Sequence, residues 1–260
     1  MKEEVKIFFT AVMFYTRIPC PNNIDHHPDY INKATRYFPL MGWIVGGISF
    51  LFYWASALLF DSNIALVVML AAGILVTGAF HEDGFADVCD GFGGGWTKER
   101  ILTIMKDSQI GAYGAIGIVL LLLLKYVGLQ HLIIQPFNNA EVALIFITYH
   151  SLARLTAINI VFTATYARDD ERSKAKPIAK AHSYKEIVGA YFFGIAPLLL
   201  LCYVHYNFLW VIIPLIITCL LARRYFNKWL QGYTGDCLGA VEQLAEVIII
   251  ITFVALCKYL

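Results

Sequence analysis

The densest group of carboxylates in the sequence occupies residues 81–91, which read His-Glu-Asp-Gly-Phe-Ala-Asp-Val-Cys-Asp-Gly. Asp83, Asp87 and Asp90 are spaced i, i+4 and i+7, so on a helix their side chains would share one face within about two turns. Like charges on one stripe repel each other unless a cation offsets them. Carboxylate oxygens are the ligands that Mg²⁺ prefers, with substrate phosphates completing its shell. The spacing therefore favours a magnesium site, and a solvated acidic helix end is the alternative.

More polar residues follow this acidic string. The glycines at 91 and 93–95 are typical of a flexible connection, although such turns can also cradle a phosphate. Thr97 is suited to cap a short helix that runs to about Asp107. Asp107 is a further carboxylate that could lie close to Asp83, Asp87 and Asp90 in the fold, and Ser108 follows it directly. We therefore interpret residues 81–114 as one acidic, metal-binding loop.

Three ionisable residues stand inside apolar stretches, namely Lys125, Arg154 and Glu246. Ionisable groups at membrane depth are costly, and they usually face the interior of a helix bundle or a water-filled cavity. The two cations could pair with the aspartates or with an anionic substrate. They could also snorkel to the surface or form a purely structural ion pair. His150 precedes Arg154 by one helical turn and is interpreted as a packing residue.

Thr234, Gly235 and Asp236 precede the last apolar stretch, in which Glu242 and Glu246 follow. Helix N-termini attract phosphate groups, so Thr-Gly-Asp ahead of a helix could form an anion or metal site. Thr and Asp are also common as plain helix caps. Both interpretations stay open from these residues alone.

The composition indicates an integral membrane protein. Hydrophobic residues make up 59% of the 260, charged residues only 15%, and the mean hydropathy is +0.64. Average soluble domains contain about 45–50% apolar and about 25% charged residues. A membrane helix needs roughly 20 mostly apolar residues. Seven stretches approach this requirement, at about 38–60, 64–80, 115–134, 142–164, 187–204, 207–222 and 241–258. We expect an all-α, polytopic helix bundle that forms a single domain over residues 1–260.

The charge of the loops predicts their orientation. Lys and Arg occur only in alternate connections between the apolar stretches. These are the four longer connections, 17–37, 81–114, 165–186 and 223–240. The three shorter connections between them contain neither residue. This alternation follows the positive-inside rule and places the long connections in the cytoplasm. The most basic of them, 165–186, could bind an anionic substrate or lipid headgroups.

The remaining features exclude several alternatives. Glu3 and Glu4 do not suit the basic start of a secretory signal. We therefore expect residues 1–16 to form a short helix at or in the membrane surface. The six cysteines form no CxxC pair and are interpreted as free thiols packed among apolar residues. The net charge of +1 gives no case for a nucleic-acid partner.

The acidic string resembles the signature of the cobalamin synthases, the adenosylcobinamide-GDP ribazoletransferase family. The matching residues are His81, Asp83, Gly84, Ala86, Asp87, Asp90 and Gly91. Less specific matches follow in the family's order over nearly the whole chain, at Thr16–Pro21, Phe38–Gly42, Asp107–Gly114, Lys125, Arg154, Tyr166–Arg168, Thr234–Ala240 and Glu246. Glu82 and the glycines at 93–95 stand outside this resemblance.

The resemblance implies a Mg²⁺-dependent enzyme of a prokaryotic inner membrane, with its active site on the cytoplasmic face. It would join adenosylcobinamide-GDP to α-ribazole or α-ribazole 5′-phosphate and release GMP. Asp83, Asp87 and Asp90 would hold Mg²⁺, and Asp107 or Asp236 would accept a proton from the attacking hydroxyl. The substrate-binding residues would be Arg17, Arg154, Arg168, Lys125, Ser108, Thr234 and Glu246. The oligomeric state stays open, a homo-oligomer included.

Three other functions fit part of the sequence. CDP-alcohol phosphotransferases also place aspartates at helical spacing around metals, but their pattern has Ala-Arg where this chain has Ala86 and Asp87. A transporter or channel could use Lys125, Arg154 and Glu246 as an ion path, but the spans do not divide into two matching halves. A membrane scaffold without activity is the third alternative.

Overall fold

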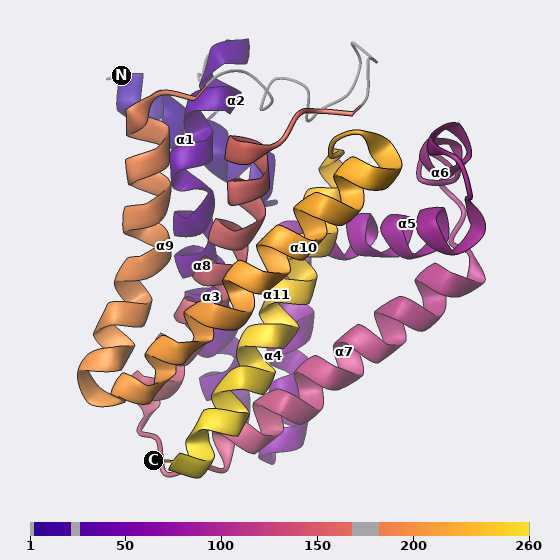
Figure 1. Cartoon of the computed structure of the whole chain (residues 1–260). Coiled ribbons are helices and arrows are strands. Elements are labelled where there is room, and N and C mark those ends of the chain that lie inside the picture. Colours follow the sequence, from indigo (N-terminus) through magenta and orange to yellow (C-terminus); the bar gives the residue numbers. More distant parts are fainter. Residues whose placement is uncertain (1–2, 22–26, 168–181, 260) are drawn as a thin grey trace.

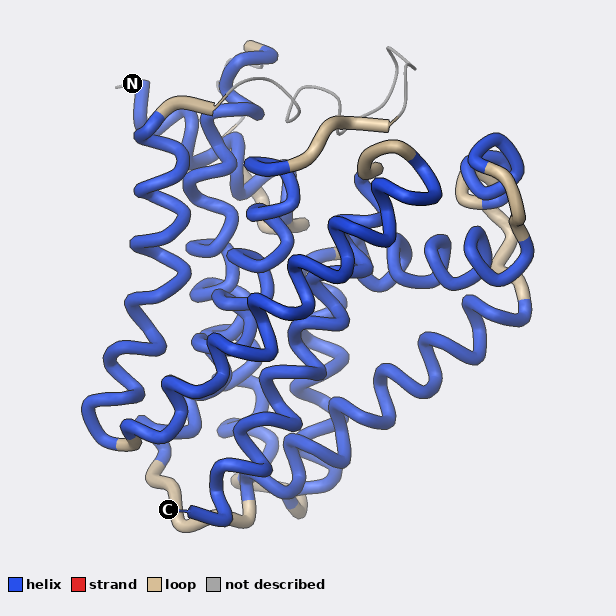
Figure 2. Tube along the Cα trace, in the orientation of Figure 1, coloured by secondary structure: helices blue, strands red, loops and turns tan. Residues whose placement is uncertain are grey.

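The computed structural model describes residues 3–21, 27–167 and 182–259. Within these ranges every regular element is a helix (Figure 2). The one extended pairing among these residues is an isolated bridge between Tyr166 and Tyr233. The predicted all-α architecture is therefore confirmed.

Six helical segments are long and apolar enough to cross a membrane. They are α3 (Phe38–Ala57) with the short helices before it, α7 (Ala112–Ile133), α8 (Asn139–Thr163), α9 (Tyr184–Val204), α10 (Ile212–Leu230) with the 3₁₀ turn η3 (Tyr206–Val211), and α11 (Gly235–Leu256). A seventh crossing results if α4 (Ser62–Thr77) and α5 (Phe80–Gly94) count together as one broken span. The expectation of about seven spans in a helix bundle is thus confirmed for the ranges described.

α8 is the most deeply buried of these spans, whereas α7, α9 and α10 expose most of their surface. Gly42 and Gly46 of α3 allow a close approach to α8. A Cβ atom at Gly42 would lie 2.6 Å from the backbone nitrogen of Ser151, and one at Gly46 would lie 2.7 Å from the Cα atom of Ile147. Small residues four positions apart are a common way for membrane helices to pack closely. α3 therefore packs closely on α8, which with α11 forms the most buried part of the bundle.

Side-chain caps fix where several helices begin. Asn138 and Glu141 form a capping box at α8, and Ser183 and Glu186 form one at α9. Each box satisfies backbone N–H groups that the first turn of a helix leaves free. Thr97 caps α6 (Lys98–Ile104), as its sequence position predicted.

The second predicted span ends early, because the chain turns sharply at Gly78 and Ala79. α4 stops at Thr77, and α5 continues at 89° to it (Figure 1). Both turn residues have left-handed backbone conformation, with φ of 67° at Gly78 and 57° at Ala79. Glycine adopts this conformation freely, whereas for alanine it costs on the order of 1 kcal/mol. The helix that carries the aspartates therefore runs across the bundle and not along it.

Two predicted loops prove to be largely helical. Residues 81–114 contain most of α5 and all of α6, and the predicted loop 223–240 shrinks to residues 231–234 between α10 and α11. The short helix after Thr97 was expected, although it ends at Ile104 and not near Asp107. The hydropathy pattern missed the last turns of α10 because they are polar and contain Arg223, Arg224 and Lys228. Helix formation continues beyond the apolar stretch at both places.

Two short helices precede the first span. α1 (Glu3–Tyr15) confirms the expected N-terminal helix, whereas α2 (Pro28–Ala34) was not predicted. The 3₁₀ turn η1 (Thr35–Tyr37) carries Arg36, whose guanidinium lies 2.9 Å from the carboxylate of Glu4 and 2.5 Å from that of Glu186 on α9. These ion pairs tie the N-terminal helix to the bundle. The contact of residues 1–16 with a membrane surface stays a prediction.

The described parts of the N-terminal segment and of the predicted loops 165–186 and 223–240 lie at one end of the bundle, which we call the predicted cytoplasmic end (Figure 1). There the amide of Ala167 donates to the carbonyl of Tyr233 at 2.8 Å, and the amide of Tyr233 donates to the carbonyl of Thr165 at 2.9 Å. These bonds join the segment after α8 to the segment before α11. The N-terminal helices lie at the same end, and the C-terminus lies at the opposite one (Figure 1).

Candidate functional site

α5 presents its aspartates on one side and apolar residues on the other. Successive helical residues are about 100° apart, so Asp83 and Asp87 lie roughly 40° from each other, whereas Phe85 and Val88 point to the opposite half. Asp83 is exposed and Asp87 is half-buried. Phe85 and Val88 line an apolar groove together with α10 and α11. The expected acidic face is thus present on α5.

α5 packs against the N-terminus of α11 through Gly84, which lies between the acidic and the apolar side of α5. A Cβ atom at Gly84 would stand only 3.0 Å from the Cα atom and the carbonyl oxygen of Asp236. One turn further along α11, a Cβ atom at Gly239 would stand 3.0 Å from the carbonyl oxygen of His81. The two glycines allow the helix backbones to touch. The structure therefore brings Asp236 next to the helix of Asp83 and Asp87.

Asp90 is engaged at the start of α7. Its carboxylate oxygens accept hydrogen bonds from the amides of Gly111 and Gly114 at 2.7 and 2.8 Å. Free N–H groups and the helix dipole both favour a carboxylate at this place. In the part of the chain that the structure describes, the ligand atoms of Asp83, Asp87 and Asp90 form no set within 4.8 Å of one another. Asp90 thus has a capping contact with α7 through both of its carboxylate oxygens.

Arg17 lies at the bend before α5. Its amide donates to the carbonyl of Val76 at 2.7 Å, and its side chain covers Gly78 so closely that a Cβ atom there would collide with it. The guanidinium-bearing side chain is otherwise exposed to solvent. Arg17 is therefore placed at the start of the acidic helix, where it could meet an anionic ligand. Arg168, predicted for the same task, falls outside the described residues.

Asp107 and Ser108 lie toward the other end of α5. Both residues are exposed, in the loop after α6, and α6 packs on α5 at Gly91. Gly91 lies about two helical turns beyond Gly84, the contact point of Asp236. The two candidate proton acceptors, Asp107 and Asp236, are thus separated along α5. Asp236 is the one at the start of the acidic face.

Thr234 is a buried helix cap. Its hydroxyl accepts a hydrogen bond from the amide of Cys237 at 3.3 Å and lies 3.4 Å from the carboxylate of Asp236, to which it can donate. The residue is fully enclosed, with 0% of its surface exposed. Its position explains how the first turn of α11 is fixed. Direct binding of substrate by Thr234 stays a prediction.

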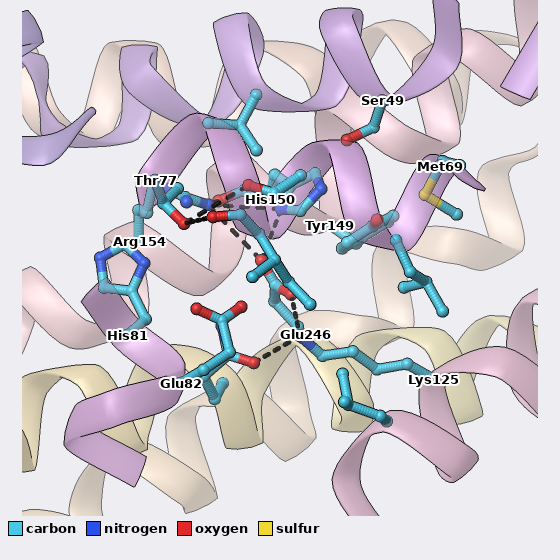
Figure 3. A pocket seen from close by; sticks show the side chains of 16 residues that line it. Ser49, Met69, Thr77, His81, Glu82, Lys125, Tyr149, His150, Arg154 and Glu246 are labelled. Atoms are coloured by element: carbon cyan, nitrogen blue, oxygen red, sulfur yellow. Dashed lines mark hydrogen bonds and ion pairs between the residues drawn. The ribbon is translucent and has the colours of Figure 1, made fainter. Parts of the chain in front are cut away.

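A network of buried charges lies next to α5, and Figure 3 shows its members other than Glu242. Its members, Lys125, His150, Arg154, Glu242 and Glu246, are at most 7% exposed. The carboxylate of Glu246 lies 2.6 Å from Nζ of Lys125 and 2.5 Å from Nδ1 of His150. Arg154 pairs with Glu242 at 2.7 Å and with Glu246 at 3.5 Å. These five residues, the buried network, join α7, α8 and α11.

Two residues of α5 extend this network to the acidic helix. Glu82 accepts a hydrogen bond from the side-chain amide of Gln243 at 3.0 Å, and the oxygen of that amide accepts one from Lys125 at 2.5 Å. Nδ1 of His81 lies 3.7 Å from a carboxylate oxygen of Glu242. The start of α5 is therefore anchored to the buried charges.

A cavity of about 20 Å³ lies beside the buried network, lined by residues such as Glu82 and His150 (Figure 3). One buried water needs roughly 10–15 Å³, so the cavity has room for a water and not for a substrate. His150, Glu242 and Glu246 are the one group in the described ranges whose ligand atoms lie close enough to share a metal ion. Lys125 and Arg154 already supply the compensating positive charge, so we interpret the group as part of an ion-pair network.

Sequence reasoning missed Glu82, Glu242 and His150 as partners of the predicted residues. A signal was present, because Glu242 and Glu246, like His150 and Arg154, are four positions apart and must share a helix face. The spacing does not reveal which helix each face meets. The pairing of Lys125 with Glu246 and Gln243, and not with the aspartates, therefore needed the structure.

Two buried hydroxyls near the predicted cytoplasmic end, those of Tyr15 and Tyr233, have no hydrogen-bond partner among the described residues. Burial raises the pKa of both phenols above their usual range. Both groups therefore stay protonated and can donate a hydrogen bond. Tyr233 directly precedes the Thr234 cap, and Tyr15 stacks on Phe38 with 4.3 Å between the ring centroids.

Comparisons with known proteins agree on one family. Residues 7–254 match the family model of cobalamin-5-phosphate synthase. The adenosylcobinamide-GDP ribazoletransferase of Shewanella frigidimarina is 42% identical over 248 residues, which cover 94% of this chain and 92% of that protein. The protein of the same name from Leptospira biflexa is 38% identical over 260 residues, covering 95% and 94% of the two chains. No solved structure matches this chain.

Proposed function

Since this chain belongs to the cobalamin-5-phosphate synthase family, we propose that it joins adenosylcobinamide-GDP to α-ribazole or α-ribazole 5′-phosphate. The chain is an enzyme of the adenosylcobinamide-GDP ribazoletransferase class, the name that its relatives carry. In the proposed reaction a ribose hydroxyl attacks the phosphorus next to the cobinamide, and the bond from this phosphorus to GMP breaks. The products are GMP and adenosylcobalamin or its 5′-phosphate.

The location of the reaction rests on the contact between Gly84 and Asp236. At this contact the first turn of α11 meets α5, and the bend that Arg17 covers at Gly78 lies six residues before it. Charge neutralisation and in-line positioning are what phosphoryl transfer requires. We place the active site at this junction of α5 and α11.

The residues at the junction fit a magnesium ion. Asp83 is exposed and Asp87 is half-buried on the same face, and the backbone of Asp236 contacts α5 at Gly84. In the described ranges the ligand atoms of these three residues do not lie within 4.8 Å of one another, so their side chains would have to close around the ion. All three offer hard carboxylate oxygens, which Mg²⁺ binds together with water and substrate phosphates. Asp90 fits less well, because both its oxygens already accept hydrogen bonds from α7. A bound Mg²⁺ would neutralise charge on the pyrophosphate oxygens.

The chain's own side chains would bind and position the substrates. Arg17 is exposed at the start of α5, and its guanidinium can form two parallel hydrogen bonds to a phosphate. Asp236 can accept the proton of the attacking hydroxyl, because it lies at the same junction. The protonated hydroxyls of Tyr15 and Tyr233 are buried donors without a partner among the described residues, and a polar group of the substrate would reach them only after the side chains around them move.

Lys125, Arg154 and Glu246 have a different task in this proposal. The cavity beside them is about 20 Å³, too small for any part of the substrate. Their pairs with Glu242, His150 and Gln243, and the link of Gln243 to Glu82, hold the first turn of α5 in place. They are positioning residues for the acidic face.

We place the junction on the cytoplasmic side of the cell membrane. The Lys and Arg residues of the connections favour this orientation, and the six apolar spans favour a multi-pass protein. The guanosine nucleotide that would be released is also a cytoplasmic compound in this scheme. A cysteine introduced at Asp107→Cys should react with a membrane-impermeant thiol reagent in inside-out vesicles and not in intact cells.

The decisive assay offers different activated donors to the purified protein in detergent, with α-ribazole and Mg²⁺ present. We expect GMP release from adenosylcobinamide-GDP and no CMP release from a CDP-alcohol. CMP release would instead support a phospholipid-type phosphotransferase. Ion flux through proteoliposomes without any nucleotide requirement would support a transporter.

A further inference from the structure

A second binding surface lies on the side of α5 that faces away from its aspartates. α5, α10 and α11 enclose an apolar groove of about 610 Å³ there. Its walls include Phe85, Val88, Leu221, Leu244 and Ile248. This volume falls in the range of about 300–1,000 Å³ that is usual for ligand sites. The groove is therefore large enough for a specific apolar ligand.

The groove has a charged end and an apolar end. Arg224 and Lys228, on the last turns of α10, line it near the predicted cytoplasmic end, and both are exposed. No Asp or Glu is among the residues that line it. Thr218 of α10 and Ile248 of α11 mark the opposite, apolar end. Its ligand should thus combine an anionic group with a long apolar part.

The length of the groove fits one leaflet of a bilayer. Thr218 and Lys228 are both helical and ten positions apart, which corresponds to about 15 Å along the axis of α10. The hydrocarbon core of a bilayer is about 30 Å thick, so one leaflet contributes about 15 Å. Tyr225, also in the lining, and the neighbouring Trp229 are residue types that favour the headgroup level.

We propose that the groove binds an anionic glycerophospholipid of the cytoplasmic leaflet. One acyl chain lies between α10 and α11, and the lipid phosphate binds Arg224 and Lys228. The ligand contacts Phe85 and Val88, which are about 140–200° around α5 from Asp83. The lipid therefore supports the acidic helix from its membrane side without entering the active site.

The test measures thermal unfolding of the full chain in a neutral detergent, with phosphatidylglycerol or phosphatidylcholine added at equal concentration. At about 100 times its dissociation constant, phosphatidylglycerol should raise the melting temperature of the wild type by roughly 5–10 °C. Phosphatidylcholine should raise it by less than half as much. The double variant Arg224→Ala/Lys228→Ala should lose most of the difference between the two lipids.

Arg223→Ala is the matched control, because Arg223 adjoins Arg224 on α10 but does not line the groove. This variant should keep the full response to phosphatidylglycerol. Ala222→Trp, which fills the groove, should lose the response while keeping the wild-type melting temperature in detergent alone.

Three results would overturn the proposal. One is an equal rise in the melting temperature of the wild type with both lipids. Another is a loss of the phosphatidylglycerol response in Arg223→Ala as large as that in Arg224→Ala/Lys228→Ala. The third is a stabilisation by inorganic phosphate as large as that by phosphatidylglycerol, which would make the site one for a soluble anion. Failure of the donor assay would refute the proposed reaction and leave this lipid site unaffected.

Discussion

Gly84 of α5 and Asp236 of α11 are in backbone contact, since a Cβ atom at Gly84 would stand 3.0 Å from the Asp236 Cα atom. The contact sets the distance between the acidic face of α5 and the first turn of α11. A side chain at position 84 would separate these two elements. The geometry of the proposed active site therefore depends on a glycine that takes no part in the chemistry.

We predict that Gly84→Ala lowers the rate of GMP release at least tenfold. The added methyl group meets backbone and not a flexible side chain, so overpacking should cost about 1–3 kcal/mol of stability as well. Gly47→Ala is the matched control, because a Cβ atom at Gly47 would have no neighbour within 4 Å. Steady-state rates and melting temperatures of both variants check this, and equal activity of the two would contradict it.

Asp83→Asn and Asp87→Asn should lower kcat by a hundredfold or more and raise the Mg²⁺ concentration needed for half-maximal rate. Asp90→Asn should behave differently. Its carboxylate accepts hydrogen bonds from Gly111 and Gly114, so its loss should cost about 1–2 kcal/mol of stability and leave the Mg²⁺ dependence unchanged. Magnesium titrations and thermal melts distinguish the two outcomes.

Asp61→Asn serves as the control for these three substitutions. Asp61 caps α4 at the opposite end of that helix from Gly78, and asparagine caps helices equally well. A shift in the Mg²⁺ titration of Asp90→Asn as large as that of Asp83→Asn would show that Asp90 is a ligand after all.

Removal of divalent cations with EDTA should stop GMP release, and added Mg²⁺ should restore it. The melting temperature should change by little, because Asp83 is exposed and no helix contact depends on it among those described. Unimpaired turnover in EDTA would exclude a magnesium requirement. A large drop in melting temperature would show that a metal is structural.

Glu246→Gln should destabilise the protein by about 3–5 kcal/mol, because it removes the carboxylate that binds Lys125 and His150 in the interior. The double variant Lys125→Met/Glu246→Gln should recover part of this loss, since it removes the unpaired cation too. Unfolding curves for Lys125→Met, Glu246→Gln and the double variant give the coupling free energy between Lys125 and Glu246. Additive effects of the two substitutions would contradict a direct interaction.

Tyr233→Phe should leave the melting temperature unchanged or slightly higher, because the buried hydroxyl has no partner among the described residues. If this hydroxyl donates to the substrate, KM should rise while kcat changes little. Thr234→Val tests the neighbouring cap, and we expect it to lower stability by about 1 kcal/mol. A loss of stability in Tyr233→Phe comparable to that in Thr234→Val would show that the hydroxyl is bonded within the fold.

The spans were predictable because hydrophobicity in a membrane is a local property of the sequence. Lys125, Arg154 and Glu246 were singled out for the same reason, because they interrupt apolar stretches, but the sequence left open whether the two cations are buried or reach the surface. The direction of α5 was not predictable, because it depends on the left-handed backbone of Ala79, a residue that rarely adopts it. The aspartate spacing gave the helix face of Asp83 and Asp87 correctly, since a helix repeats regularly.

Tertiary partners escaped prediction because periodicity describes one helix at a time. Nothing in the spacing of Asp90 shows that the amides of α7 approach it. The closeness of Asp236 to the acidic face likewise comes from the packing of Gly84 and Gly239. Glu82 stood outside the resemblance drawn from the sequence, yet it links α5 to Gln243.

The pairing of Lys125 and Arg154 with Glu242 and Glu246 has a consequence for biogenesis. The cations emerge from the ribosome long before α11, which supplies their carboxylates. The translocon must therefore accept two helices whose charges are still uncompensated, at a cost of about 2.5–3.5 kcal/mol each at the bilayer centre. Insertion of the last helix completes the neutralisation, so a nascent chain truncated before α11 carries a defect that cellular quality control can recognise.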